Sequence, residues 1–184
     1  YSIVEELIPH RKNWRKFPII SIPIPQPSPA PSPAPREDRL GFDTNCLRIV
    51  PEAGGRYLLT DGRSRMKVFP NRGEAEQALR IIRHYRLDSR GFVGRPDPSL
   101  EYWLTGGRAP VGSMPGEDAI RFNPRNLEVK LVRGSWKIVE GSHFLLSFPN
   151  QREASEALGI IRRYGFTHLC FVGRPNASMT YLRR

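Results

Sequence analysis

The chain contains an internal repeat. Tyr57–Leu104 aligns with Trp136–Arg183 without a gap, and 19 of the 48 aligned positions are identical. Both segments carry the string Phe-Val-Gly-Arg-Pro, at Phe92–Pro96 and at Phe171–Pro175. The sequence therefore predicts a tandem duplication, in which shared positions serve the folding of each copy, a ligand common to both, or both purposes.

The repeat extends upstream and defines the predicted parts of the chain. Phe42 and Leu47 have the same spacing as Phe122 and Leu127. We predict an extended Pro-rich N-terminal arm (1–41), a first module (42–104), a Gly/Pro linker (105–121) and a second module (122–184). A domain of ~60 residues buries only ~60% of its unfolded surface. We therefore expect the two modules to pack their apolar faces on each other, with a pseudo-twofold axis as one arrangement.

Hydrophobic periodicity predicts the same secondary structure in each module. In the second module, alternating and apolar runs indicate strands at 127–132, 136–139 and 143–148, and two more at 169–172 and 179–182. Asn150 followed by Glu153, and Asn71 followed by Glu74, are typical of helix N-termini. Gly165 is suited to end the second helix. The predicted fold is α+β, with each module a βββαββ unit of one helix on a mostly antiparallel sheet.

The repeated turn after each Phe-Val-Gly-Arg-Pro string holds the candidate ligand-binding residues. They are Arg95, Ser99, Tyr102, Arg174, Ser178 and Tyr181. Arginine beside hydroxyl groups can hold an anionic or sugar-like ligand, which would give two matched sites. The alternative is structural, with glycine allowing the turn and each arginine paired to Glu74 or Glu153.

Charge and motifs restrict the other functions. The net charge is +11, of which the second module carries +6, and this favours an acidic polysaccharide or another polyanion as a ligand. No nucleic-acid-binding motif accompanies the charge, so specific nucleic-acid binding is not predicted. We find no catalytic motif or metal-ligand spacing, and we predict no enzyme activity, cofactor or metal. Glu117 and Asp118 are expected to be solvated in the linker, without altered pKa values.

The chain has two cysteines, Cys46 and Cys170, at positions that are not equivalent in the repeat. In an oxidising compartment they could form a disulfide that joins the two modules. The interpretation that we favour is two buried free thiols.

The N-terminal arm is the main candidate for contact with a partner. Its prolines favour an extended backbone, and no run of ~20 apolar residues is present to span a membrane. A start at Tyr1 fits removal of an export signal, as well as a start chosen for expression. We predict an exported, non-enzymatic structural or assembly subunit whose arm docks on the same or another subunit. The apolar docking residues are Ile3, Val4, Leu7, Trp14, Phe17, Ile19, Ile20, Ile22 and Ile24.

Overall fold

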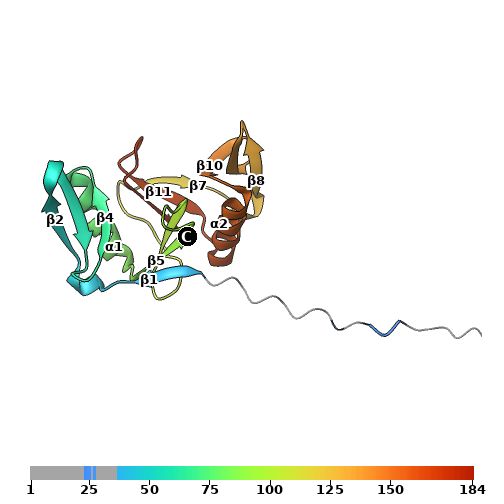
Figure 1. Ribbon diagram of the computed structural model, residues 1–184, viewed down its shortest axis with the longest axis horizontal. Helices are drawn as coiled ribbons and strands as arrows, with labels where there is room; N and C mark the ends of the chain where they lie inside the picture. The colour runs from blue at the N-terminus through green and yellow to red at the C-terminus, as the bar shows by residue number, and fades with distance from the viewer. Residues whose placement is uncertain (1–22, 26, 28–36) are drawn as a thin grey trace, which may run out of the picture. The chain divides into compact units, whose positions relative to one another are not determined.

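The computed structural model describes residues 23–25, 27 and 37–184. The chain divides into two units, Tyr1–Pro35 and Arg36–Arg184, and every described helix and strand belongs to the second unit, called here the body. The body is α+β, as predicted, with twelve strands in four small antiparallel sheets and two α-helices (Figure 1). None of its helices has the length and apolar character required to cross a membrane.

The elements follow each other in the same order in the two halves of the body. The first half contains β1 (Asp38–Gly41), β2 (Arg48–Glu52), β3 (Arg56–Thr60), β4 (Arg65–Phe69), α1 (Arg72–Tyr85), β5 (Ser89–Val93) and β6 (Leu100–Leu104). The second half contains β7 (Asp118–Arg121), β8 (Leu127–Val132), β9 (Ser135–Glu140), β10 (His143–Phe148), α2 (Gln151–Tyr164), β11 (His168–Val172) and β12 (Met179–Arg183).

The strands of each half belong to two separate sheets, and the prediction of one sheet for each module was wrong. One sheet of each half is a meander, β2-β3-β4 or β8-β9-β10. The other has its C-terminal hairpin beside a short first strand, in the orders β1-β5-β6 and β12-β11-β7. Neither β1 nor β7 was predicted, because each has only four residues and lies in a segment that reads as arm or linker.

Both helices are capped at their N-terminal and C-terminal ends. The Asn71 side chain accepts a hydrogen bond from the backbone of Glu74, and Asn150 accepts one from Glu153, each at 2.9 Å. This confirms the two predicted N-caps. Gly165 ends α2 in the left-handed conformation, with a φ of 67°. The same conformation ends α1 at Arg86, with a φ of 54°, although a side chain is strained there.

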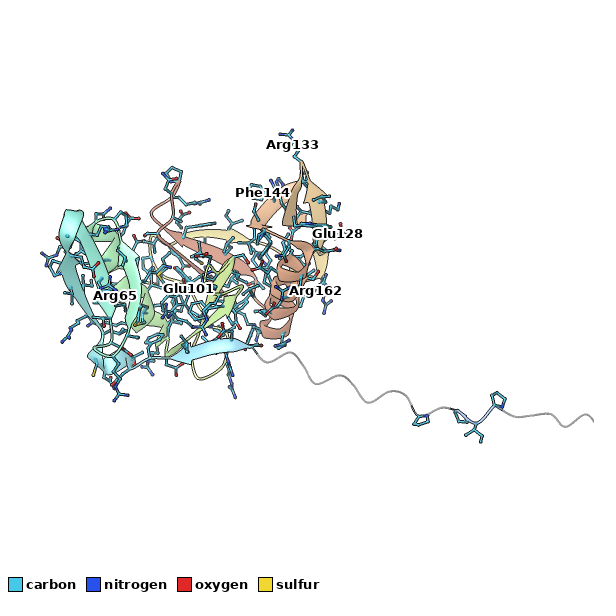
Figure 2. The ribbon with its side chains drawn as sticks, viewed as in Figure 1. Arg65, Glu101, Glu128, Arg133, Phe144 and Arg162 are labelled. Atoms are coloured by element: carbon cyan, nitrogen blue, oxygen red, sulfur yellow. The ribbon has the colours of Figure 1, made fainter. Side chains whose placement is uncertain are left out.

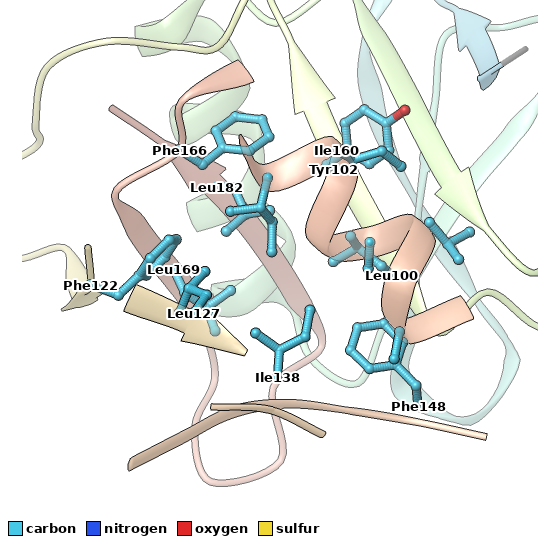
Figure 3. Packing of buried hydrophobic residues seen from close by; sticks show 14 of the residues in the cluster. Leu100, Tyr102, Phe122, Leu127, Ile138, Phe148, Ile160, Phe166, Leu169 and Leu182 are labelled. Carbon is cyan, nitrogen blue, oxygen red and sulfur yellow. The ribbon is translucent and has the colours of Figure 1, made fainter. Parts of the chain in front are cut away.

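The core joins the two halves crosswise. One cluster packs β5 and β6 of the first half against α2 and the β8-β9-β10 sheet of the second half. Figure 3 shows Leu100 and Tyr102 of the first half among Ile138, Phe148 and Ile160 of the second. The other cluster packs α1 and the β2-β3-β4 sheet against β11 and β12, and β6 lies in contact with β12. Each helix therefore covers the C-terminal hairpin of the other half.

Candidate functional site

The repeated Gly-Arg-Pro turns lie where one half meets the other. Gly94 and Gly173 both have a φ of +80°. A Cβ atom built on Gly94 would lie 1.6 Å from Oε1 of Glu153, and one on Gly173 would lie 1.6 Å from Oε1 of Glu74. Glycine is therefore needed twice over, for the left-handed backbone and for the close approach of a carboxylate from the opposite helix.

The candidate serines complete these contacts. The Ser99 hydroxyl donates to Oε1 of Glu153 at 3.2 Å, and the Ser178 hydroxyl donates to Oε1 of Glu74 at 3.0 Å. The other oxygen of each glutamate accepts from the N-cap asparagine of its own helix. Each capping glutamate thus joins the start of one helix to the turn of the other half.

The candidate arginines pair with aspartates, and the expected pairing with Glu74 or Glu153 was wrong. Nε of Arg95 lies 2.5 Å from Asp38, and Nε of Arg174 lies 2.6 Å from Asp118. A second nitrogen of each guanidinium bonds the other carboxylate oxygen, so both pairs are bidentate. Each guanidinium also lies over a phenylalanine of the preceding strand, 4.9 and 4.3 Å from the ring centre. An external anion would have to compete with these aspartates.

Tyr102 belongs to a network around the partly buried carboxylate of Glu37. This carboxylate accepts hydrogen bonds from the hydroxyls of Tyr102, at 3.0 Å, and Tyr164, at 2.5 Å, and it pairs with Arg163. Tyr102 lies on β6, whereas Tyr164 and Arg163 lie at the end of α2. The carboxylate that precedes β1 therefore binds both halves of the body.

Tyr181 belongs to the equivalent network around Glu117. Oε2 of Glu117 accepts from Tyr85 at 2.5 Å and from Tyr181 at 2.6 Å, and Oε1 accepts from Nε of Arg183 at 2.7 Å. Only 4% of the Glu117 side chain and 9% of the Arg183 side chain are exposed. The roles of the halves are exchanged here, because Tyr85 comes from α1 and the other three residues come from the second half.

The electrostatics of the networks keep the carboxylates ionised and the phenols neutral. Burial by itself raises the pKa of Glu37 and of Glu117, but the bonds from two tyrosines and one arginine outweigh it, so both pKa values are lowered. Burial and the bond to Glu37 raise the pKa of Tyr164 to about 12. The same two causes, burial and a glutamate, raise the pKa values of Tyr85, Tyr102 and Tyr181.

We expect stability to fall at both ends of the pH range. A lowered pKa in the folded state means that Glu37 and Glu117 stabilise the fold above their unfolded pKa of 4.5, and that this contribution is lost as the pH falls through the folded pKa. A raised tyrosine pKa affects stability in the opposite direction. The tyrosines stabilise the fold fully below their unfolded pKa of 10.0, and this contribution is lost as the pH rises, toward about 12 for Tyr164.

Denaturant unfolding at a series of pH values, together with the ultraviolet absorbance of tyrosinate, would measure both effects. The four network phenols should ionise only as the protein unfolds. Their ionisation near pH 10.0 in a protein that stays folded would contradict the networks.

The acidic half of both networks was not predicted, because Glu37 and Asp38 read as part of the arm. The expectation of a solvated side chain was wrong for Glu117, which is 4% exposed, and the expectation of unaltered pKa values was wrong for both Glu117 and Asp118. The bond and charge of Arg174 also lower the pKa of Asp118. A signal was present, because Pro35–Asp38 and Pro115–Asp118 share the pattern Pro-x-Glu-Asp in front of equivalent phenylalanines.

The two cysteines are free thiols, as favoured from the sequence, and the structure lacks the disulfide that was the other possibility. Cys170 is buried in the cluster around α1, where burial above all raises its thiol pKa to about 12. Cys46 is exposed, with its Sγ atom 3.2 Å from Asp43. The expectation of a buried thiol is thus wrong for Cys46. The Cys170 side chain faces the core, whereas Cys46 is the last residue of a surface 3-10 turn, Thr44–Cys46. The two thiols therefore do not meet.

Neither a metal site within the described residues nor a similar protein indicates a function for the chain. Within the residues that the structure describes, no group of three or more His, Cys, Asp or Glu side chains is placed to hold a metal ion. No protein-family model matched the chain, and no match was found among curated proteins or solved structures.

Proposed function

We propose that the chain is a non-enzymatic structural subunit of a larger, exported assembly, and that its N-terminal arm docks on a neighbouring subunit. The body arose, on this proposal, by tandem duplication of a βββαββ core. The observation that carries it is the use of the repeated polar residues. Arg95, Ser99 and Tyr102, and their counterparts in the second half, each pair with a carboxylate of the chain itself. Contacts within the body are therefore a sufficient reason for these polar residues to occur in both copies.

The residue that joins the arm to the body is held by contacts with both halves, and this supports a docking role for the arm. The described part of the body begins with Glu37, whose side chain is only 12% exposed. Because Glu37 binds Tyr102 of one half and Tyr164 of the other, a pull on the arm would be shared by both halves. A docking arm needs such a fixed attachment to the body if its contact with a neighbour is to position the whole subunit.

The arm itself supplies the apolar docking surface in this proposal. Of the predicted docking residues, only Ile24 lies within the described part of the chain, and 87% of it is exposed. The other eight lie outside the described residues. Their expected role is hydrophobic burial against a partner, each large side chain contributing roughly 1.5–3 kcal/mol when fully covered.

Deletion of residues 1–35 tests the proposal. The deletion stops before Glu37, so both networks and β1 are retained and the body should unfold at an unchanged temperature. Light scattering should show an assembly for the full chain and a monomer for the shortened chain. The pair Ile20→Asp and Ile22→Asp should have the same effect, whereas Ser28→Asp with Ser32→Asp adds the same charge without removing apolar surface. An unchanged mass after the deletion would reject the arm as the docking element.

The second candidate function is binding of an acidic polysaccharide or another polyanion. The observation that favours it is the net charge of +11, which attracts polyanions in general. Arg95 and Arg174 are engaged by Asp38 and Asp118, so a ligand at these two positions would have to displace a bidentate partner. Retention on a heparin column that depends on Arg95 and Arg174 would support that placement, and retention without such dependence would oppose it.

A further inference from the structure

A hollow with unpaired arginines lies at the C-terminal end of α1, and no residue of the two glutamate networks lines it. It has a volume of about 470 Å³ and lies between the last turn of the helix and the 3-10 turn that follows β1. Its lining residues are Thr44, Asn45, Ile82, Arg83 and Arg86. Among the described residues, neither guanidinium has an acidic partner or a hydrogen-bond acceptor.

The second half provides a direct comparison for Arg83. Arg162 has the equivalent position in α2, near the end of that helix (Figure 2). Its guanidinium donates to the carbonyl of Leu127 at 2.8 Å and to that of Pro124 at 3.3 Å. Arg162 therefore has a structural role that accounts for an arginine at this position. Arg83 makes no such bonds, so its guanidinium remains available in the hollow.

Arg86 is the second unusual feature of the hollow. It has a left-handed backbone, with a φ of 54°, at the position where α2 has Gly165. Glycine adopts this conformation without strain, whereas a residue with a Cβ atom does not. A strained residue that glycine could replace indicates a use for its side chain. Here the side chain adds a second positive charge to the hollow.

The charges around the hollow favour an anion. The C-terminal end of a helix carries about half a negative charge, and Asp43 is the acidic residue that precedes the 3-10 turn. The Asp43 carboxylate already accepts from the backbone of Asn45 at 3.0 Å and from the Cys46 thiol. Beyond it, Asp61 accepts bonds from the backbones of Arg63 and Asp43. The charge of Asp61 is offset by that of Arg63, and both act on the neighbouring Cys46. The two full charges of Arg83 and Arg86 then exceed the negative charge of the helix end and Asp43.

We propose that this hollow binds a sulfate or carboxylate group of an acidic polysaccharide. Two guanidinium forks can each donate paired hydrogen bonds to such a group. The side chains of Thr44 and Asn45 can bond neighbouring sugar hydroxyls. No aromatic side chain lines the hollow, so it lacks the stacking surface that a nucleic-acid base requires. The site is independent of the arm and of the assembly role proposed above.

Binding of heparin to the full chain, measured by calorimetry at several salt concentrations, tests this site. The pair Arg83→Gln with Arg86→Gln should weaken binding about tenfold or more. Arg162→Gln should leave the affinity unchanged, because that guanidinium serves the backbone. The charge-matched pair Arg133→Gln with Arg152→Gln removes the same net charge elsewhere and should weaken binding less than about threefold. Both of its residues are exposed.

Arg86→Gly separates binding from folding. It should raise the melting temperature, because glycine relieves the left-handed backbone, and it should weaken heparin binding at the same time. Three results would overturn the proposal: no heparin binding by the unchanged chain, equal losses in the Arg83/Arg86 and Arg133/Arg152 pairs, or single-stranded DNA that binds as tightly as heparin and with the same dependence on Arg83.

Discussion

Replacing Glu117 by alanine is expected to lower the free energy of unfolding by about 3–5 kcal/mol. The change leaves the charge of Arg183 unpaired, and this is costly because only 9% of that side chain is exposed to solvent. It also removes the acceptor of the hydroxyls of Tyr85 and Tyr181. Most of the loss comes from these stranded groups and not from the intrinsic strength of the pair, since removing one member of a buried ion pair leaves the other uncompensated. Denaturant unfolding measures the change.

Two further variants make that result specific. Glu128 also forms an ion pair, with Lys130 at 3.1 Å, but 63% of its side chain is exposed (Figure 2). Glu128→Ala should therefore change the free energy of unfolding by at most ~0.5 kcal/mol. Leu104 has the position in β6 that Arg183 has in β12. Adding Arg183→Leu to Glu117→Ala should recover part of the loss, because no buried charge is then left alone. Equal losses for Glu117→Ala and Glu128→Ala would contradict the buried network.

Replacing Gly94 by alanine is the other change with a large expected effect. Its left-handed backbone accounts for roughly 1–2 kcal/mol of the loss with any L-residue. The new methyl group would also meet Glu153, which is buried and bonded to both Ser99 and Asn150. Displacing that carboxylate should add roughly 1–3 kcal/mol.

Gly54 is the matched control for this change. It has a φ of +79°, close to that of Gly94, and a Cβ atom there would meet nothing within 4 Å. Gly54→Ala therefore measures the backbone contribution alone. The difference between the two variants in free energy of unfolding isolates the contact between Gly94 and the helix of the other half. A difference near zero would show that the glycine serves its turn only.

The sequence predicted the parts that depend on local pattern. Asn71 and Asn150 were found as N-caps because capping is decided within four residues. The meander β8-β9-β10 was found because its strands alternate and its turns contain Gly134 and Gly141. Such signals lie inside one short segment, so each can be read without knowledge of the rest of the fold.

The crosswise arrangement could not be read in this way. Each helix has an apolar face, but the face does not specify which half supplies the hairpin that covers it. The strands β1 and β7 form through pairing with β5 and β11, which are distant in the sequence. The sequence therefore singled out Tyr102 and Tyr181 as candidate ligand-binding residues, but it did not identify Glu37 and Glu117, which accept their hydrogen bonds. Only the shared Pro-x-Glu-Asp pattern pointed to these partners.

We expect that neither half of the body folds without the other, because each helix covers the C-terminal hairpin of the other half. Producing residues 36–108 and 109–184 separately and following their thermal unfolding by circular dichroism tests this most directly. We predict that each piece alone lacks a cooperative transition as a monomer, because its helix and hairpin have no partner. The equimolar mixture should regain a cooperative transition and a one-to-one complex. A monomeric piece that unfolds cooperatively by itself would contradict the claim.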